Sequence, residues 1–146
     1  MKWPVSFPVR LLQKLNRGVT VNLCYTFVMD CIFCKIIHKE AAANIIFEDE
    51  HSVVISTIEP VSKGHVLVLP KKHYTNVLDI DEGVLGHLAV LSQKIARQQI
   101  DHNNADGVNL LHAAGLAAQQ SVFHFHIHVV PRYKNDGLDL WFRNSL

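Results

Sequence analysis

Three histidines near the end of the chain have the clearest chemical potential. His124, His126 and His128 alternate with apolar residues in the run Phe-His-Phe-His-Ile-His-Val-Val. Successive side chains of a β-strand point to opposite faces, so a strand here places the three imidazoles on one face at intervals of roughly 6.6 Å. The apolar residues then face the core. Because three aligned imidazoles do not serve packing, the run indicates a functional site.

Imidazoles in this arrangement support two kinds of chemistry. Histidines two residues apart on a strand can chelate one ion, as in catalytic zinc sites with three histidine ligands. Alternatively, a neutral imidazole attacks an activated phosphate and forms a labile phosphorus–nitrogen bond. Neighbouring imidazoles would orient the nucleophile, protonate the leaving group and stabilise the phosphoryl oxygens. No Asp or Glu lies among the histidines as a base or further ligand, which disfavours a catalytic metal.

The elements that position these histidines predict an α+β fold. Strands are expected over residues 44–48, 52–56, 65–69, 108–111 and 122–130, with Pro131 ending the last. One long helix is expected after an acidic capping box at Asp79 and Glu82, fading around residues 101–104. Short connections favour antiparallel pairing, so we expect an antiparallel sheet of about five strands with one long helix packed on it.

The composition limits the classes of function. A chain of 146 residues with net charge +1 suits one domain and implies no general attraction to nucleic acid or membranes. Residues 1–28 are basic and contain no acidic residue, so we expect either an N-terminal extension of open role or a mis-assigned start, before a domain over residues 29–146. Cys31-x-x-Cys34 indicates metal or redox chemistry rather than a disulfide scaffold, and we expect a cytoplasmic protein.

Four separated motifs resemble those of the histidine-triad family. They are the triad with Gln120-Ser121 before it, Gly64-His65 through Lys72-His73, the Cys31 motif, and Pro131-Arg132-Tyr133 with Leu140-Trp141-Phe142. The likeness spans residues 29 to about 142. It implies that His126 is the nucleophile and attacks the α-phosphate of a nucleoside phosphoramidate, dinucleoside polyphosphate or related purine nucleotide conjugate. A nucleotidyl-histidine intermediate would form and be hydrolysed by water.

The resemblance also assigns roles to residues around the nucleophile. His128 would contact the phosphate, His65 would support the triad from a neighbouring strand, and His124 would complete the triad. Ser121 would bond near the leaving group. Further substrate contacts are implied for Gln119, Gln120, Val122, Thr57 and Ile58. Because family members are usually dimers with joined sheets, the resemblance predicts a homodimer with a two-fold interface.

The Cys31 motif resembles the zinc site of bacterial family members. By that likeness, Cys31, Cys34, His73 and His124 would hold a structural zinc ion, with no role for metal in the chemical step. The alternative is that the cysteines are small buried side chains. His51 is a weaker substitute ligand.

Three positions depart from the family pattern. Thr57 stands where an acidic residue usually holds the ribose hydroxyls, Ala113-Ala114-Gly115 replaces an amide-containing segment, and Gln119 replaces a glycine beside the phosphate. These departures leave a nucleotide-binding regulatory module with little turnover as an alternative to the enzyme, with a metal-dependent hydrolase as the third hypothesis.

Overall fold

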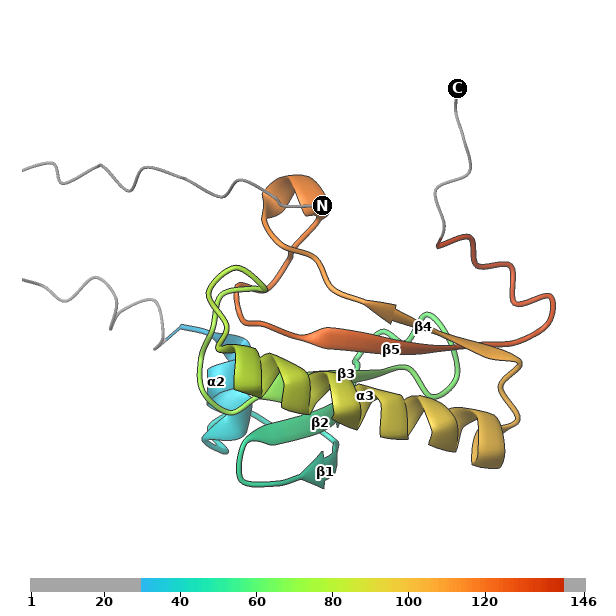
Figure 1. Cartoon of the computed structure of the whole chain (residues 1–146), viewed down its shortest axis with the longest axis horizontal. Coiled ribbons are helices and arrows are strands. Elements are labelled where there is room, and N and C mark those ends of the chain that lie inside the picture. Colours follow the sequence, from blue (N-terminus) through green and yellow to red (C-terminus); the bar gives the residue numbers. More distant parts are fainter. Residues whose placement is uncertain (1–29, 141–146) are drawn as a thin grey trace, which may run out of the picture.

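Five strands pair antiparallel in the order β1-β2-β3-β5-β4 in the computed structural model, which describes residues 30–140 (Figure 1). The strands are β1 (Ile45–Glu48), β2 (Ser52–Ser56), β3 (Val66–Pro70), β4 (Gly107–Leu111) and β5 (Ile127–Arg132). The long helix α3 (Glu82–Asn103) covers one face of the sheet. The predicted α+β fold, with five strands and one main helix, is confirmed.

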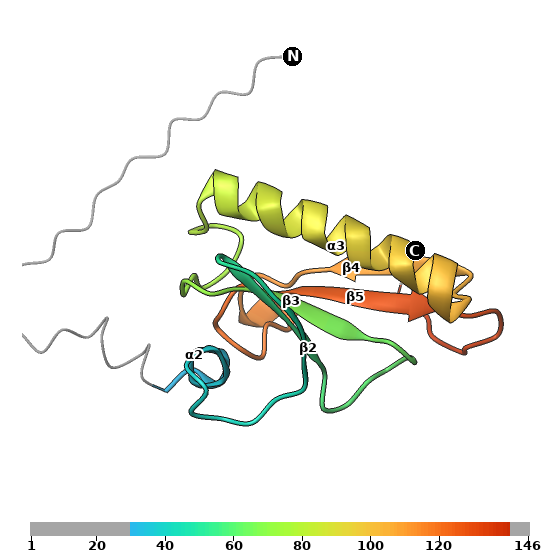
Figure 2. The ribbon, with the colours of Figure 1, turned by 90° about the horizontal axis from the view of Figure 1, so that it is seen from below.

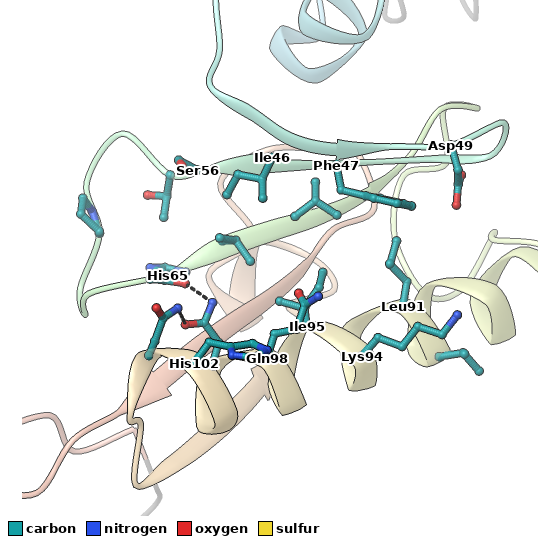
Figure 3. Close-up of a pocket in the computed structure, with 18 of the residues that line it drawn as sticks. Ile46, Phe47, Asp49, Ser56, His65, Leu91, Lys94, Ile95, Gln98 and His102 are labelled. Atoms are coloured by element: carbon teal, nitrogen blue, oxygen red, sulfur yellow. Dashed lines mark hydrogen bonds between the residues drawn. The ribbon is translucent and has the colours of Figure 1, made fainter.

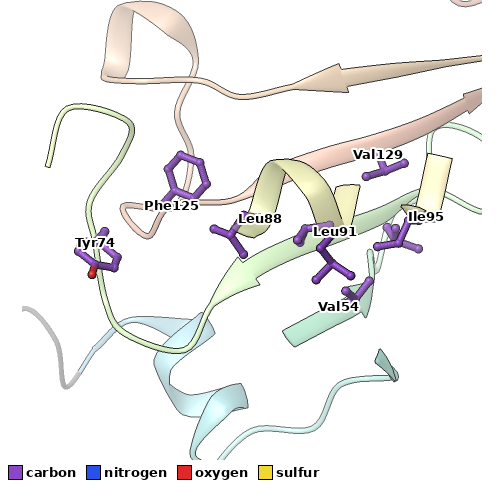
Figure 4. Packing of buried hydrophobic residues seen from close by; sticks show 9 residues of the cluster. Val54, Tyr74, Leu88, Leu91, Ile95, Phe125 and Val129 are labelled. Carbon is purple, nitrogen blue, oxygen red and sulfur yellow. The ribbon is translucent and has the colours of Figure 1, made fainter. Parts of the chain in front are cut away.

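Strands β2 and β3 are buried on both faces. On one face, α3 packs over a cluster that includes Val54, Leu88 and Phe125 (Figure 4). The short helix α2 (Ile32–Ile37) lies on the opposite side of the sheet from α3 (Figure 2). There, Phe33 packs with Ile55 and the neighbouring apolar residues of β2 and β3. The alternation of side chains along a strand divides these residues between the two faces.

Helix α3 begins two residues later than a cap at Asp79 would place it. Asp81 is the N-cap, and its carboxylate accepts hydrogen bonds from the backbone N–H groups of Gly83 and Val84. The predicted capping box is therefore wrong. Asp79 instead accepts from the N–H groups of Thr75 and Asn76 and holds the preceding loop. The helix ends before Asn104, within the predicted range.

The last strand is shifted toward the C-terminus relative to the prediction. β5 begins at Ile127 and continues through Pro131, whereas His124 and His126 precede it. The N–H of Phe125 donates to the carbonyl of Tyr74, outside the strand ladder. Pro131 fits within the strand because β3 pairs with β5 only as far as Val129, so a missing N–H on that side breaks no ladder bond.

Among residues 30–140, no helix has both the length and the apolar character needed to span a bilayer. The predicted extension, residues 1–28, lies outside the described residues.

Candidate active site

The ring of His126 is held by the backbone of a neighbouring triad member. Its Nδ1 lies 2.7 Å from the carbonyl oxygen of His124. A carbonyl only accepts hydrogen bonds, so Nδ1 carries the proton and Nε2 of the neutral ring keeps its lone pair. The ring of Phe33 packs edge to face against the imidazole of His126, with the two ring centroids 5.3 Å apart. The geometry therefore presents one unprotonated ring nitrogen.

Two hydrogen bonds in series orient His128. The N–H of Val61 donates to Nδ1 of His65 at 3.4 Å, and Nε2 of His65 lies 3.0 Å from Nδ1 of His128. Because Nδ1 of His65 accepts, its proton resides on Nε2 and is donated to His128. The neutral ring of His128 then carries its own proton on Nε2. The ring centroids of His126 and His128 are 4.9 Å apart, so an acceptor and a donor nitrogen belong to adjacent rings.

Burial keeps these imidazoles neutral. Desolvation lowers the pKa of His65 and, despite the bond to the His124 carbonyl, that of His126. Desolvation, assisted by the neighbouring rings of His126, His65 and His112, lowers the pKa of His128 to about 4. Near neutral pH the rings therefore serve as hydrogen-bond partners and a potential nucleophile rather than as cations.

His124 faces a different group of side chains. Its Nδ1 lies 3.5 Å from Sγ of Cys31 and 3.6 Å from Sγ of Cys34, and Nδ1 of His73 lies 3.3 Å from Sγ of Cys34. These four ligand atoms all lie within 4.8 Å of one another. Nε2 of His124 bonds to the carbonyl of Pro70 at 3.0 Å, which leaves Nδ1 free of a proton and available to a metal.

This donor set fits a tetrahedral Cys₂His₂ site of the kind that zinc prefers. Burial and the neighbouring thiol of Cys31 raise the pKa of Cys34 to about 12. A cation bound beside this thiol would lower its pKa. The prediction that three imidazoles line one strand face at equal intervals is wrong, because His124 precedes β5 and turns toward the cysteines.

The segment before the triad is fixed by hydrogen bonds between the side chain of Gln120 and backbone groups of the protein. Gln120 is only 3% exposed. Its side-chain oxygen accepts from the N–H of Gly115, and its amide nitrogen donates to the carbonyls of Thr75 and Val122. This amide is therefore occupied by the protein itself. Gln119 has φ +65°, a left-handed conformation that favours glycine.

The remaining predicted substrate contacts lie at two places. Ser121 is exposed, while Val122 is partly buried against the apolar cluster beneath α2. In the loop after β2, the hydroxyl of Thr57 accepts from the N–H of Glu59 at 3.1 Å, and Ile58 is 97% exposed. The structure therefore places these residues in two loops, one that precedes His65 and one that precedes the triad.

Backbone groups complete the site, and sequence reasoning missed all of them. The N–H of Val61 and the carbonyls of Pro70 and His124 set the proton positions of three imidazoles. Every residue type offers such backbone groups, so no residue pattern signals which of them serve a site.

A hollow of about 800 Å³ lies between the β1–β2 hairpin and α3 (Figure 3). Phe47, Leu91 and Lys94 line it, and it reaches His65 at one end. Among the described residues around this hollow, neither His126 nor His128 contributes. The hollow is therefore distinct from the pair of adjacent imidazoles.

Comparison with known proteins adds to this geometry. The family model of the HIT domain matches residues 38–135. The chain belongs to the HIT family. Protein hit of Bacillus subtilis is 42% identical over 109 residues, which cover 74% of this chain and 75% of the relative.

Two further HIT proteins bear on metal and activity. The crystal structure of a zinc-bound histidine triad family protein from Mycobacterium smegmatis has a TM-score of 0.73 and 40% identity, and covers 77% of this chain and 82% of that one. Adenylylsulfatase HINT3 of Arabidopsis thaliana is 36% identical over 121 residues, 83% of this chain and 60% of the relative. The proteins similar to this chain thus include a zinc-bound histidine triad protein and one named as an adenylylsulfatase.

Proposed function

We propose that this HIT protein is a nucleotidyl hydrolase or transferase that works through a covalent nucleotidyl-histidine intermediate on His126. The observation that carries the proposal is the bond between Nδ1 of His126 and the carbonyl of His124. It leaves Nε2 unprotonated beside the ring of His128. A neutral imidazole with a fixed tautomer is a competent nucleophile near neutral pH.

In the first step, the Nε2 lone pair of His126 attacks the α-phosphorus of a purine nucleotide conjugate. A phosphorus–nitrogen bond forms as the bond to the leaving group breaks. The Nε2–H of His128 donates a hydrogen bond to the leaving group or to a phosphoryl oxygen, and His65 supports it by donating to Nδ1. The departing group takes its proton from solvent. In the second step, water attacks phosphorus, the phosphorus–nitrogen bond breaks with its electron pair returning to Nε2 of His126, and the water's proton passes to solvent.

Substrate contacts fall to residues that face outward. Ser121 is exposed and offers a hydroxyl to the leaving group, while Thr57 and Ile58 lie in the loop assigned to the nucleoside. The side-chain amide of Gln120 is already bonded to three backbone groups. We therefore assign Gln120 to holding the loop and leave contact with substrate to Gln119, Ser121 and Val122.

The substrate class is a purine nucleoside phosphoramidate, a dinucleoside polyphosphate or an adenylyl conjugate such as the name of the Arabidopsis relative indicates. A second candidate is a nucleotide-binding module with little turnover. It is favoured by Gln119, which stands at a left-handed backbone position where the family pattern has glycine. The two functions differ in whether the covalent intermediate forms.

A structural zinc ion is proposed for Cys31, Cys34, His73 and His124. When bound, zinc would hold α2, the loop after β3 and the segment before β5 together, without entering the reaction. The deprotonated Nδ1 of His124 and the mutual distances of the four ligand atoms support this assignment.

A homodimer that joins two sheets is proposed from the edge position of β4. Beside this edge lies an apolar depression of about 210 Å³, lined by residues that include Leu85, Leu110 and Ile127. Leu110 is 48% exposed. Light scattering of the wild type and of Leu110→Lys tests the dimer, which this change should weaken.

Covalent trapping tests the enzymatic proposal. Purified protein is mixed with adenosine and guanosine phosphoramidates, quenched in mild alkali and examined by intact mass. We expect a nucleotidyl adduct in the wild type and none in His126→Asn. Nucleotide binding without an adduct or turnover across the panel would support the regulatory module instead.

A further inference from the structure

The ring of His112 links two backbone segments, that of Val77 and that of the proposed nucleophile His126. His112 follows the last residue of β4. Its Nδ1 lies 2.9 Å from the carbonyl oxygen of His126, and the N–H of Val77 donates to its Nε2 at 3.1 Å. Its ring lies against that of Phe125, with centroids 4.5 Å apart. Each polar atom of the imidazole therefore has a backbone partner, and one partner belongs to His126.

The two partners determine which nitrogen carries the proton. A backbone N–H only donates, so Nε2 of His112 must be the acceptor. A carbonyl only accepts, so Nδ1 must carry the hydrogen. An imidazolium or the opposite tautomer would lose at least one of these bonds. The two bonds therefore select the Nδ1–H tautomer of His112.

The loop that carries Val77 is itself fixed. Asp79 accepts from the N–H groups of Thr75 and Asn76, and the side chain of Gln120 donates to the carbonyl of Thr75. The donor to His112 thus comes from a loop with its own network of bonds. His112 can transmit this fixed position to whatever its Nδ1 bonds.

His126 needs such support because it precedes β5 and its carbonyl lies outside the strand ladder. The neighbouring Ala113 and Ala114 offer no side-chain donor to this segment. The ring of His126 is tied to the His124 carbonyl on one side of the residue, and the His112 bond ties the peptide on the other. Rotation of this peptide would change the direction in which Nε2 points.

We propose that His112 is a positioning residue for the nucleophile, acting through the carbonyl of His126 rather than by contact with substrate. The proposal rests on the proposed function, because it takes His126 as the reacting group. It predicts that loss of the Nδ1 donor lowers the rate of nucleotidyl transfer to His126 and leaves substrate affinity nearly unchanged. Small errors in the aim of a reacting group reduce rate strongly.

The test compares two substitutions with opposite expectations. His112→Phe keeps an aromatic ring against Phe125 but offers no donor, and we expect the single-turnover rate of adduct formation to fall about tenfold or more at unchanged KM. His112→Asn places an amide donor near the position of Nδ1 and should stay within about threefold of the wild type. His102→Phe, at an exposed position in α3, controls for the loss of a histidine.

Nitrogen NMR of the wild-type rings supplies a second readout that needs no variant. We expect His112 to show the Nδ1–H tautomer. The opposite tautomer, equal losses in both variants, or a wild-type rate in His112→Phe would each overturn the proposal. Absence of an adduct in the wild type would instead mark failure of the proposed function, which the tautomer measurement distinguishes from failure at His112.

Discussion

Nε2 of His65 lies 3.0 Å from Nδ1 of His128, and the two rings are tilted by 36°. Because the N–H of Val61 occupies the other nitrogen of His65, the proton of His65 is directed at His128. The two imidazoles therefore behave as a donor and an oriented acceptor, and the outer nitrogen of His128 is left as the donor toward a substrate.

Substitution of His65 should act through His128. We expect His65→Phe to lower kcat about a hundredfold with little change in KM, because it removes the bond that fixes the tautomer of His128. The measurement is a double-mutant cycle with His128→Asn. If the two residues act as a unit, the double variant should be no slower than His128→Asn alone. Independent, additive losses would contradict the relay.

The stability of the protein should fall as the solution becomes acidic. Burial holds the pKa of His128 at about 4, below its ordinary value of 6.5, and lowers the pKa of His65 in the same direction. Between these values the unfolded chain binds more protons than the folded one, so stability is fully present above pH 6.5 and is lost toward pH 4. Chemical denaturation across this range should show a shallower decline for His128→Asn. Parallel curves for the two proteins would contradict the assignment.

The metal cluster should bind cobalt as well as zinc. Cobalt(II) reports a tetrahedral Cys₂His₂ set by its visible absorption, and we expect this spectrum in the wild type and its loss in Cys34→Ser. Removal of zinc by a chelator should lower the unfolding temperature, since structural zinc contributes to folding free energy. The exposed His51→Ser is the matched control and should bind cobalt like the wild type. A cobalt spectrum unchanged in Cys34→Ser would exclude this ligand set.

Glycine at position 119 should stabilise the fold. Gln119 has φ +65°, a conformation that costs a side-chain-bearing residue more than glycine. We expect Gln119→Gly to raise the free energy of unfolding by up to about 1 kcal/mol. Gln119→Ala retains the Cβ and should give no such gain. Denaturant unfolding measures both, and equal effects of the two substitutions would show that backbone conformation is not the cause.

A carboxylate at position 57 should strengthen nucleotide binding. The hydroxyl of Thr57 already accepts from the N–H of Glu59, and a charge-assisted bond to a ribose hydroxyl is stronger than a neutral one. We expect Thr57→Asp to lower KM for an adenosine phosphoramidate about tenfold, and Thr57→Asn to change it little. The gain should vanish for a substrate lacking both ribose hydroxyls. An equal gain on that substrate would assign the effect to something other than the ribose.

The pattern of apolar residues along the chain predicted the strands of the sheet and the long helix. The short apolar runs that form β2 and β3 and the helical spacing of Leu88, Leu91 and Ile95 correspond to residues that the structure buries. These signals are strong because one misplaced apolar side chain in a buried strand or helix costs free energy locally. The clustering of Cys31, Cys34, His73 and His124 also followed from the family likeness.

Choices that depend on tertiary contacts were not predictable. Asp79 and Asp81 are chemically equivalent as helix caps, and only the bonds from Thr75 and Asn76 to Asp79 decide between them. Likewise, the alternating run before Ile127 has every local feature of a strand. It leaves the sheet because Phe125 bonds to Tyr74 and His124 turns toward the cysteines.

The double burial of β2 and β3 also bears on how fast different parts of the chain exchange their amide hydrogens with deuterated water. Amides of these two strands can exchange only when the whole sheet opens, so they should be the last to gain deuterium. The segment from His112 to His126 lies outside the strands and is held by isolated backbone and side-chain bonds rather than by a strand ladder. Its amides should exchange early, so slower deuterium uptake there would report ligand occupancy against an unchanging central signal.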